Sequence, residues 1–258
     1  MADNPLDQFK IKEILDVPPI GPLDFSFTNS SLYMVLCVAT LALFFSAALS
    51  GRALIPGRIQ STAELLYEFV AGMVRDTAGT EGMRFFPFVF TLFCFILTAN
   101  LLGMMSFLPY NFTVTSHIIV TFALASVVIL VVLIYGIMRN GLGFLRLFAP
   151  KGLPVALLPI IIPIEVISFL TRPISLSVRL FANMFAGHTM LKVFAGFVVG
   201  LAGFGTANAS AGGMAMAIIP LFAATAVTAL EFLVAFLQAY IFAILTSIYL
   251  NDAIHPSH

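Results

Sequence analysis

The sequence predicts an all-α polytopic membrane protein with five transmembrane helices and one amphipathic surface helix. Hydrophobic residues make up 60% of the 258 residues and charged residues only 9%, whereas soluble domains carry about 25% charged residues. The mean hydropathy is +1.07, and several apolar stretches reach the roughly 20 residues that cross a bilayer as a helix. The formal net charge is zero, which excludes a nucleic-acid partner recruited by bulk positive charge.

The first 31 residues are predicted to form an extramembrane N-terminal tail, because residues 1–31 are polar and contain several prolines. Acidic residues crowd the start of this tail, a pattern unlike the basic and then apolar pattern of a signal peptide. Residues 32–258 show no internal repeat and no low-complexity segment. They are therefore predicted to form a single membrane domain.

The first span is expected at about residues 32–50, a stretch without charged residues. Residues 61–77 are too polar to span and are predicted to form the surface helix, with a capping box of Ser61 and Glu64 at its start. Its apolar residues repeat at helical spacing on one face; they are Leu65, Leu66, Phe69, Val70, Met73 and Val74. This face either lies in the membrane surface or packs against the protein's own helices, and both interpretations remain open.

Two ordinary spans and two long ones follow. The second and third spans are expected at about residues 85–108 and 117–138, the fourth and fifth at about 153–199 and 214–250. The last two are much longer than the 17–25 residues of a normal span, so they must tilt or kink. Because a short turn of small residues joins them, they are predicted to be long, tilted and antiparallel.

The orientation follows from the basic residues in the connecting segments. These residues lie after the first and third spans, whereas the connections after the second and fourth carry none. They are Arg52, Arg58, Arg75, Arg84, Arg139, Arg146 and Lys151. Since cytoplasmic loops are enriched in Lys and Arg, the N-terminus is predicted outside and the C-terminus in the cytoplasm. A bacterial inner membrane fits this pattern, and a mitochondrial inner membrane is the alternative.

Ionisable residues lie at membrane depth in the last two spans, where a charge costs about 2.5–3.5 kcal/mol or more. In an antiparallel pair of helices, one residue number rises as the other falls along the membrane normal. Pairs of residues, one from each helix, whose numbers add up to nearly the same total therefore lie at the same depth in the membrane. The three predicted levels, from the outside to the cytoplasm, are His188 with Glu231, Arg179 with Gln238, and Glu165 with Asp252. At about 1.5 Å per residue, Arg179 lies about 14 Å from the level of His188 and about 21 Å from that of Glu165.

This order of residues suits proton passage in two halves. Imidazole and carboxylate groups take up and release protons, and a His–Glu pair tunes both groups toward neutral pH. The guanidinium of Arg179 keeps its proton in proteins, so it repels protons and separates the two halves. The same guanidinium attracts a carboxylate that another subunit presents.

Two runs, SLSVRLFANMFAGH at residues 175–188 and EFLVAFLQAYIFAILTSIYL at residues 231–250, resemble the subunit a family of the rotary ATP synthase. The resemblance extends over the span pattern from about residue 30 to the end. It implies a proton-translocating stator subunit that is not an enzyme by itself. Two offset half-channels would pass protons to and from the carboxylates of the c-ring and so drive rotation for ATP synthesis. The implied partners are the c-ring, b-type peripheral-stalk subunits and membrane lipid, with no nucleic acid, cofactor or metal.

The resemblance also assigns roles to residues. Arg179 matches the coupling arginine of the R-L-F-x-N motif, and Asn183 matches its asparagine. Gln238 matches the glutamine of the L-Q-A-aromatic motif. His188 and Glu231 match the outer half-channel pair, which occurs in the family in either order. Glu165 matches the cytoplasmic half-channel glutamate upstream of the arginine, and the remaining candidates are Asp252, His117 and Asn100.

Several alternatives stand beside these roles. His117 is equally compatible with a surface histidine, and Asn100 with an interhelical hydrogen bond. Arg172, which precedes a proline, is expected to satisfy freed backbone carbonyls. A self-contained ion channel or secondary transporter would embed the same residue types, but it would often show a repeat. An intramembrane enzyme using His188 and Glu231 lacks an evident nucleophile, and the chain does not determine whether the ion is H⁺ or Na⁺.

Overall fold

The computed structural model describes residues 9–15, 26–50, 55–105, 112–141, 143–144, 157–203 and 211–255. Most of the predicted N-terminal tail and the basic residues Arg52, Arg146 and Lys151 lie outside these ranges. Within the described part of the tail, strand β1 (Glu13–Leu15) pairs antiparallel with β2 (Phe27–Thr28). The division into a tail and one membrane domain stays a prediction.

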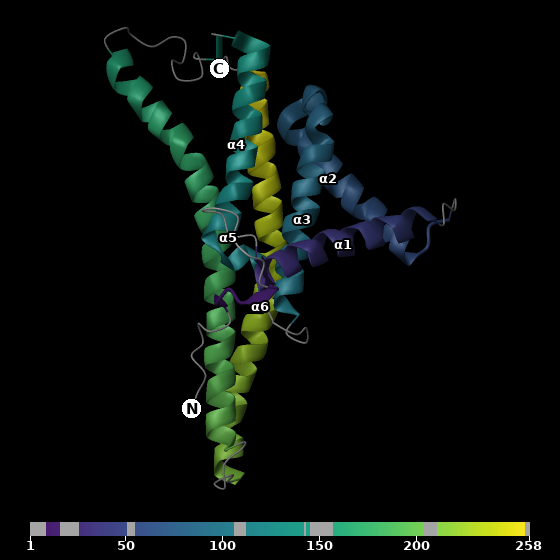
Figure 1. The fold of residues 1–258 in the computed structure, drawn as a ribbon, viewed down its shortest axis with the longest axis vertical. Helices are drawn as coiled ribbons and strands as arrows, with labels where there is room; N and C mark the ends of the chain where they lie inside the picture. The colour runs from purple at the N-terminus through teal and green to yellow at the C-terminus, as the bar shows by residue number, and fades with distance from the viewer. Residues whose placement is uncertain are drawn as a thin grey trace.

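Six α-helices account for most of the described chain (Figure 1). They are α1 (Asn29–Ser50), α2 (Arg58–Gly82), α3 (Phe86–Met104), α4 (Ile118–Asn140), α5 (Leu158–Ala202) and α6 (Ala211–Ile254). Two short 3-10 helices, η2 (Met83–Phe85) and η3 (Val114–Ser116), lie between them.

Five helical stretches of the described chain are long and apolar enough to cross a membrane. They are Asn29–Ser50, Arg58–Met104, Ile118–Asn140, Leu158–Ala202 and Gly212–Ile254. The predicted fold class, an all-α protein with five candidate spans and two long final helices, is therefore confirmed.

The helix predicted to lie on the surface is α2, and it leads through η2 directly into α3. Its predicted capping box is wrong, because the helix begins one turn earlier, after Gly57. The Ser61 backbone N–H donates to the Gly57 carbonyl at 2.8 Å, and the Glu64 carboxylate accepts a hydrogen bond from Gln60 instead. The apolar face of α2 packs into the same core as α3 and α6, with Val70 fully buried. This supports packing against the protein's own helices.

Helices α5 and α6 pack against each other in antiparallel directions (Figure 1). Figure 1 shows the N-terminal part of α5 leaning away from α4 and α6, whereas its C-terminal part follows α6 closely. Pro163 and Pro173 lie within the first half of α5, where a missing backbone N–H and a ring clash bend a helix. The two helices therefore do not keep one register along their whole length.

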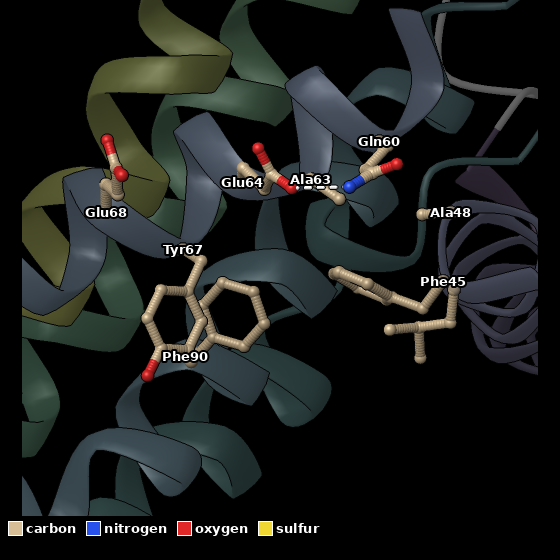
Figure 2. Close-up of a pocket in the computed structure, with 9 residues that line it drawn as sticks. Phe45, Ala48, Gln60, Ala63, Glu64, Tyr67, Glu68 and Phe90 are labelled. Atoms are coloured by element: carbon tan, nitrogen blue, oxygen red, sulfur yellow. Dashed lines mark hydrogen bonds between the residues drawn. The ribbon is translucent and has the colours of Figure 1, made fainter. Parts of the chain in front are cut away.

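A pocket of about 490 Å³ lies between α1, α2 and α3. Figure 2 shows Phe45 of α1, Tyr67 of α2 and Phe90 of α3 around it, with the Gln60–Glu64 hydrogen bond at its side. The ring of Phe90 lies 5.6 Å from that of Phe45 and 6.1 Å from that of Tyr67. None of the polar residues of the α5–α6 pair lines this pocket, so it is separate from the candidate site.

Candidate functional site

The candidate site contains a buried pair of ionisable residues, His188 on α5 and Glu231 on α6. His188 is 7% exposed and Glu231 4%, and the His188 Nε2 atom lies 3.6 Å from Glu231 Oε1. Neither carboxylate oxygen has a hydrogen-bond partner within the described residues. The antiparallel pairing thus brings together the two residues that the sequence places at one level.

Gly187 makes room for the Glu231 carboxylate. A Cβ atom added at Gly187 would lie 2.7 Å from Glu231 Oε1 and 3.0 Å from its carboxyl carbon. Real Cβ atoms do not approach that closely, so any larger residue here would displace the carboxylate. Gly187 therefore contributes to the site. The sequence shows that it precedes His188 but not that it faces Glu231 on the other helix.

Thr113 is a member of the site that the sequence reasoning missed. It lies just before η3, and its Oγ1 atom is 2.9 Å from His188 Nε2. The same hydroxyl lies 3.5 Å from the Gly103 carbonyl of α3, to which it donates. The only sequence signal was the hydroxyl-rich link between the second and third spans. Its residues nearest the site fold inward as η3, and Val114, Thr115 and Ser116 are all buried.

Asn100 forms the interhelical hydrogen bond that the sequence suggested. Its side-chain amide donates to the Ala235 carbonyl of α6 at 3.2 Å and accepts from the Thr115 hydroxyl at 2.8 Å. Because Ala235 lies one helical turn from Glu231, this fully buried asparagine ties α3 and η3 to α6 beside the pair.

His117 is not the freely solvated surface histidine of the alternative interpretation. Its ring stacks on Phe112 with a centroid distance of 4.7 Å, and its Nε2 atom is buried without a partner in the described chain. Burial lowers the pKa of His117 below its ordinary value, and a hydrogen bond with the Phe9 backbone offsets part of this effect. Burial therefore favours the neutral form of His117.

At the middle level, Gln238 bonds to Asn183 and not to Arg179. The Asn183 side-chain amide donates to Gln238 Oε1 at 3.0 Å, one turn along α5 from Arg179. The Arg179 side chain is exposed, and within the described part of the chain it makes no hydrogen bond or ion pair. It thus projects from the α5–α6 pair to where another subunit could reach it.

At the cytoplasmic level, where the sequence places Glu165 with Asp252, the structure pairs Asp252 with Arg172 instead. Asp252 accepts a hydrogen bond from Arg172 Nη1 at 3.0 Å, and the Arg172 guanidinium lies 4.8 Å from the centre of the Tyr249 ring. Arg172 therefore serves this ion pair rather than freed backbone carbonyls. Glu165 is half-buried and lies seven residues, about 10 Å, further toward the start of α5. The register slips because the first half of α5 bends away from α6.

No group of three or more His, Cys, Asp or Glu residues that could hold a metal ion occurs in the described ranges. Cys37 and Cys94 are both buried and free.

Comparisons with known proteins agree on one family. The family described as ATP synthase A chain matches residues 31–251. A protein named ATP synthase subunit a from Chelativorans sp. (strain BNC1) is 60% identical over 258 residues, which is 100% of both chains. The protein of that name from Mesorhizobium japonicum is 60% identical over 99% of this chain and 98% of its own. The one from Allorhizobium ampelinum is 61% identical over 99% of both.

Proposed function

The chain belongs to the ATP synthase A chain family, and from this membership we propose how its polar residues pass protons. It is a multi-pass membrane protein of bacteria, the proton-translocating stator subunit of an F-type ATP synthase, and non-catalytic by itself. Membership in this family overturns the alternatives of a self-contained channel, a transporter or an intramembrane enzyme.

The outer half-channel runs to the buried pair of His188 and Glu231. This pair is the observation that carries the proposal, because a buried carboxylate and imidazole 3.6 Å apart need only a small movement or one bridging water to pass a proton. Asn100 and Thr113 hold the surrounding backbone and the imidazole, and His117 lies on the same side of the membrane. A proton leaving this pair neutralises a carboxylate of the c-ring.

Arg179 stands between the outer pair and the cytoplasmic half-channel. Its exposed position on α5 suits an encounter with the deprotonated c-ring carboxylate, and its permanent charge blocks direct proton passage. Asn183 and Gln238 brace the adjoining turns through their hydrogen bond. Protons leave near Glu165, with Asp252 held by Arg172 at the margin of that path.

The partners in this proposal are the c-ring and the b-type subunits of the peripheral stalk. The chain lies in the bacterial inner membrane with its N-terminus outside and its C-terminus in the cytoplasm, as the basic residues indicate. In this orientation each proton that moves down a potential of about 100 mV releases about 2.3 kcal/mol.

The two half-channels should differ in the side from which water reaches them. Thr228→Cys and Ser168→Cys place thiols one turn from Glu231 and Glu165, in a chain whose buried cysteines are replaced by Ala. An impermeant thiosulfonate should label Thr228→Cys in right-side-out vesicles only and Ser168→Cys in inverted vesicles only. Mass spectrometry of the labelled chain reads the result.

Leu130→Cys, at an exposed apolar position of α4, is the control and should react from neither side, because a thiol in lipid stays protonated. Labelling of both test positions from one side would contradict two offset half-channels. So would a Thr228→Cys chain that is inert from both sides.

A second expectation concerns Gly187. The Gly187→Ala complex should pump protons several-fold more slowly, since the new methyl group displaces the Glu231 carboxylate. A displacement of about 0.5–1 Å is enough to misalign the carboxylate with His188 and slow proton transfer between them. Gly196→Ala is the matched control on the same helix, because a Cβ there meets nothing within 4 Å. ATP-driven acidification of inverted vesicles measures both. Equal rates for the two variants would remove Gly187 from the site.

A further inference from the structure

A second pocket, of about 470 Å³ and lined by polar residues, lies between the α2–α3 junction and the end of α4, away from the proton path. It is lined by Thr80, Glu81, Arg84 and Arg139. Thr80 and Glu81 lie in the last turn of α2, beyond Gly79, whose positive φ of 66° breaks the helix. None of these residues has a part in the half-channels.

Two arginines that line this pocket donate to one neutral acceptor, the hydroxyl of Tyr135 next to it. Arg84 Nη1 donates to the Tyr135 hydroxyl at 3.1 Å, and Arg139 Nη1 donates to the same oxygen at 3.0 Å. A tyrosine hydroxyl has two acceptor positions and one proton to donate. With both acceptor positions taken, only its proton remains, and the described residues provide no acceptor for it. Tyr135 therefore offers a donor at this place.

The charges of the pocket do not cancel. Glu81 Oε2 accepts from Arg139 Nη2 at 2.7 Å, so this carboxylate is committed to one of the two guanidinium groups. Arg84 has only the neutral Tyr135 hydroxyl as its hydrogen-bond partner in the described chain. The pocket thus keeps one net positive charge and several unused N–H and O–H donors, which together favour an oxyanion.

Apolar surface borders the pocket on the same turns of α4. Ile134, Ile137 and Met138 are 54%, 49% and 81% exposed, and they flank Tyr135 and Arg139 along the helix. A ligand with an anionic head and apolar chains would satisfy both surfaces at once. Basic pockets between transmembrane helices on the cytoplasmic side bind anionic lipid headgroups.

We propose that this pocket binds the phosphate headgroup of an anionic phospholipid. Arg84, the remaining N–H groups of Arg139 and the Tyr135 hydroxyl hold the phosphate oxygens, and the acyl chains lie against the exposed face of α4. The Glu81 carboxylate opposes binding by its charge while it positions Arg139. The site is separate from the half-channels, and it rests on the proposed function only through the orientation that places this end of α4 on the cytoplasmic side.

The test uses the intact ATP synthase complex in detergent, titrated with spin-labelled phosphatidylglycerol, whose immobilised fraction gives an association constant. Arg84→Gln should weaken binding about fivefold, the effect of one basic residue near an anionic headgroup. Glu81→Gln should strengthen it by a similar factor, because it removes the opposing charge. Arg84→Lys should retain most of the binding, and spin-labelled phosphatidylcholine should not distinguish any variant.

Arg75→Gln is the matched control, since it removes an equally exposed positive charge from α2 outside the pocket. The proposal is overturned if Arg84→Gln binds like Arg75→Gln, or if Glu81→Gln weakens binding, as a purely structural cluster would require. Should Arg84→Gln not assemble, the tighter binding expected for Glu81→Gln, against the unchanged binding expected for Arg75→Gln, still decides. Displacement of the lipid by inorganic phosphate at equal concentration would identify a free-phosphate site and reject the lipid.

Discussion

The Arg179→Ala complex should assemble at normal yield and lose ATP-driven proton pumping almost completely. Removing one partner from a charge pair in a low-dielectric contact costs about 3–5 kcal/mol, which corresponds to a loss of more than a hundredfold in rate. The exposed position of Arg179 on α5 explains why assembly should survive, because no hydrogen bond or ion pair within the described chain is broken. Fluorescence quenching in inverted vesicles measures pumping, and the yield of the chain in the purified complex measures assembly.

The same variant should also leak. Without the fixed positive charge, protons that reach His188 and Glu231 have no electrostatic barrier on their way to the cytoplasmic side, so passive proton flux should rise. Arg75→Ala, an exposed arginine of α2, should leave both pumping and leak unchanged. If Arg179→Ala pumps near the unmutated level, Arg179 is a structural residue and the proposed separation of two half-channels fails.

The helices could be predicted from the sequence because their signals are local. Uncharged apolar stretches mark α1, α3 and α4, and two overlong stretches joined by small residues mark α5 and α6. The antiparallel arrangement then follows from the short turn, and it places His188 beside Glu231 without any further information. The two helices are close together at that depth, so the rule that paired residue numbers have a constant sum correctly places His188 beside Glu231.

The remaining contacts depend on three-dimensional detail that no local pattern encodes. The bend in α5 shifts Asp252 from Glu165 to Arg172, and a sequence shows the prolines but not the size or direction of the bend. Thr113 reaches His188 because a link between helices folds into the bundle, whereas links usually run over the surface. The helix start before Ser61 illustrates the same limit, since helix ends are the least certain part of a prediction.

Exchanging the two residues of the outer pair, as His188→Glu with Glu231→His, should restore most of the proton pumping that either single substitution removes. His188→Glu alone places two carboxylates together, and their repulsion raises the cost of deprotonation. Glu231→His alone leaves no carboxylate to stabilise an imidazolium. Each single variant should therefore pump at least about tenfold more slowly, whereas the double variant should recover to within a few-fold of the unmutated complex. Pumping rates of the four complexes, normalised to assembly, form a double-mutant cycle.

The geometry around His188 and Glu231 explains why recovery is expected. A glutamate at position 188 can accept a hydrogen bond from the Thr113 hydroxyl that now lies 2.9 Å from the imidazole, and a histidine at position 231 can use the space that Gly187 leaves beside the present carboxylate. The proton chemistry would then belong to the pair, whichever helix carries each group. A coupling energy of about 1–2 kcal/mol would be consistent with this. If the double variant is no better than the worse single one, His188 and Glu231 act separately, and the pair is not the unit of the outer half-channel.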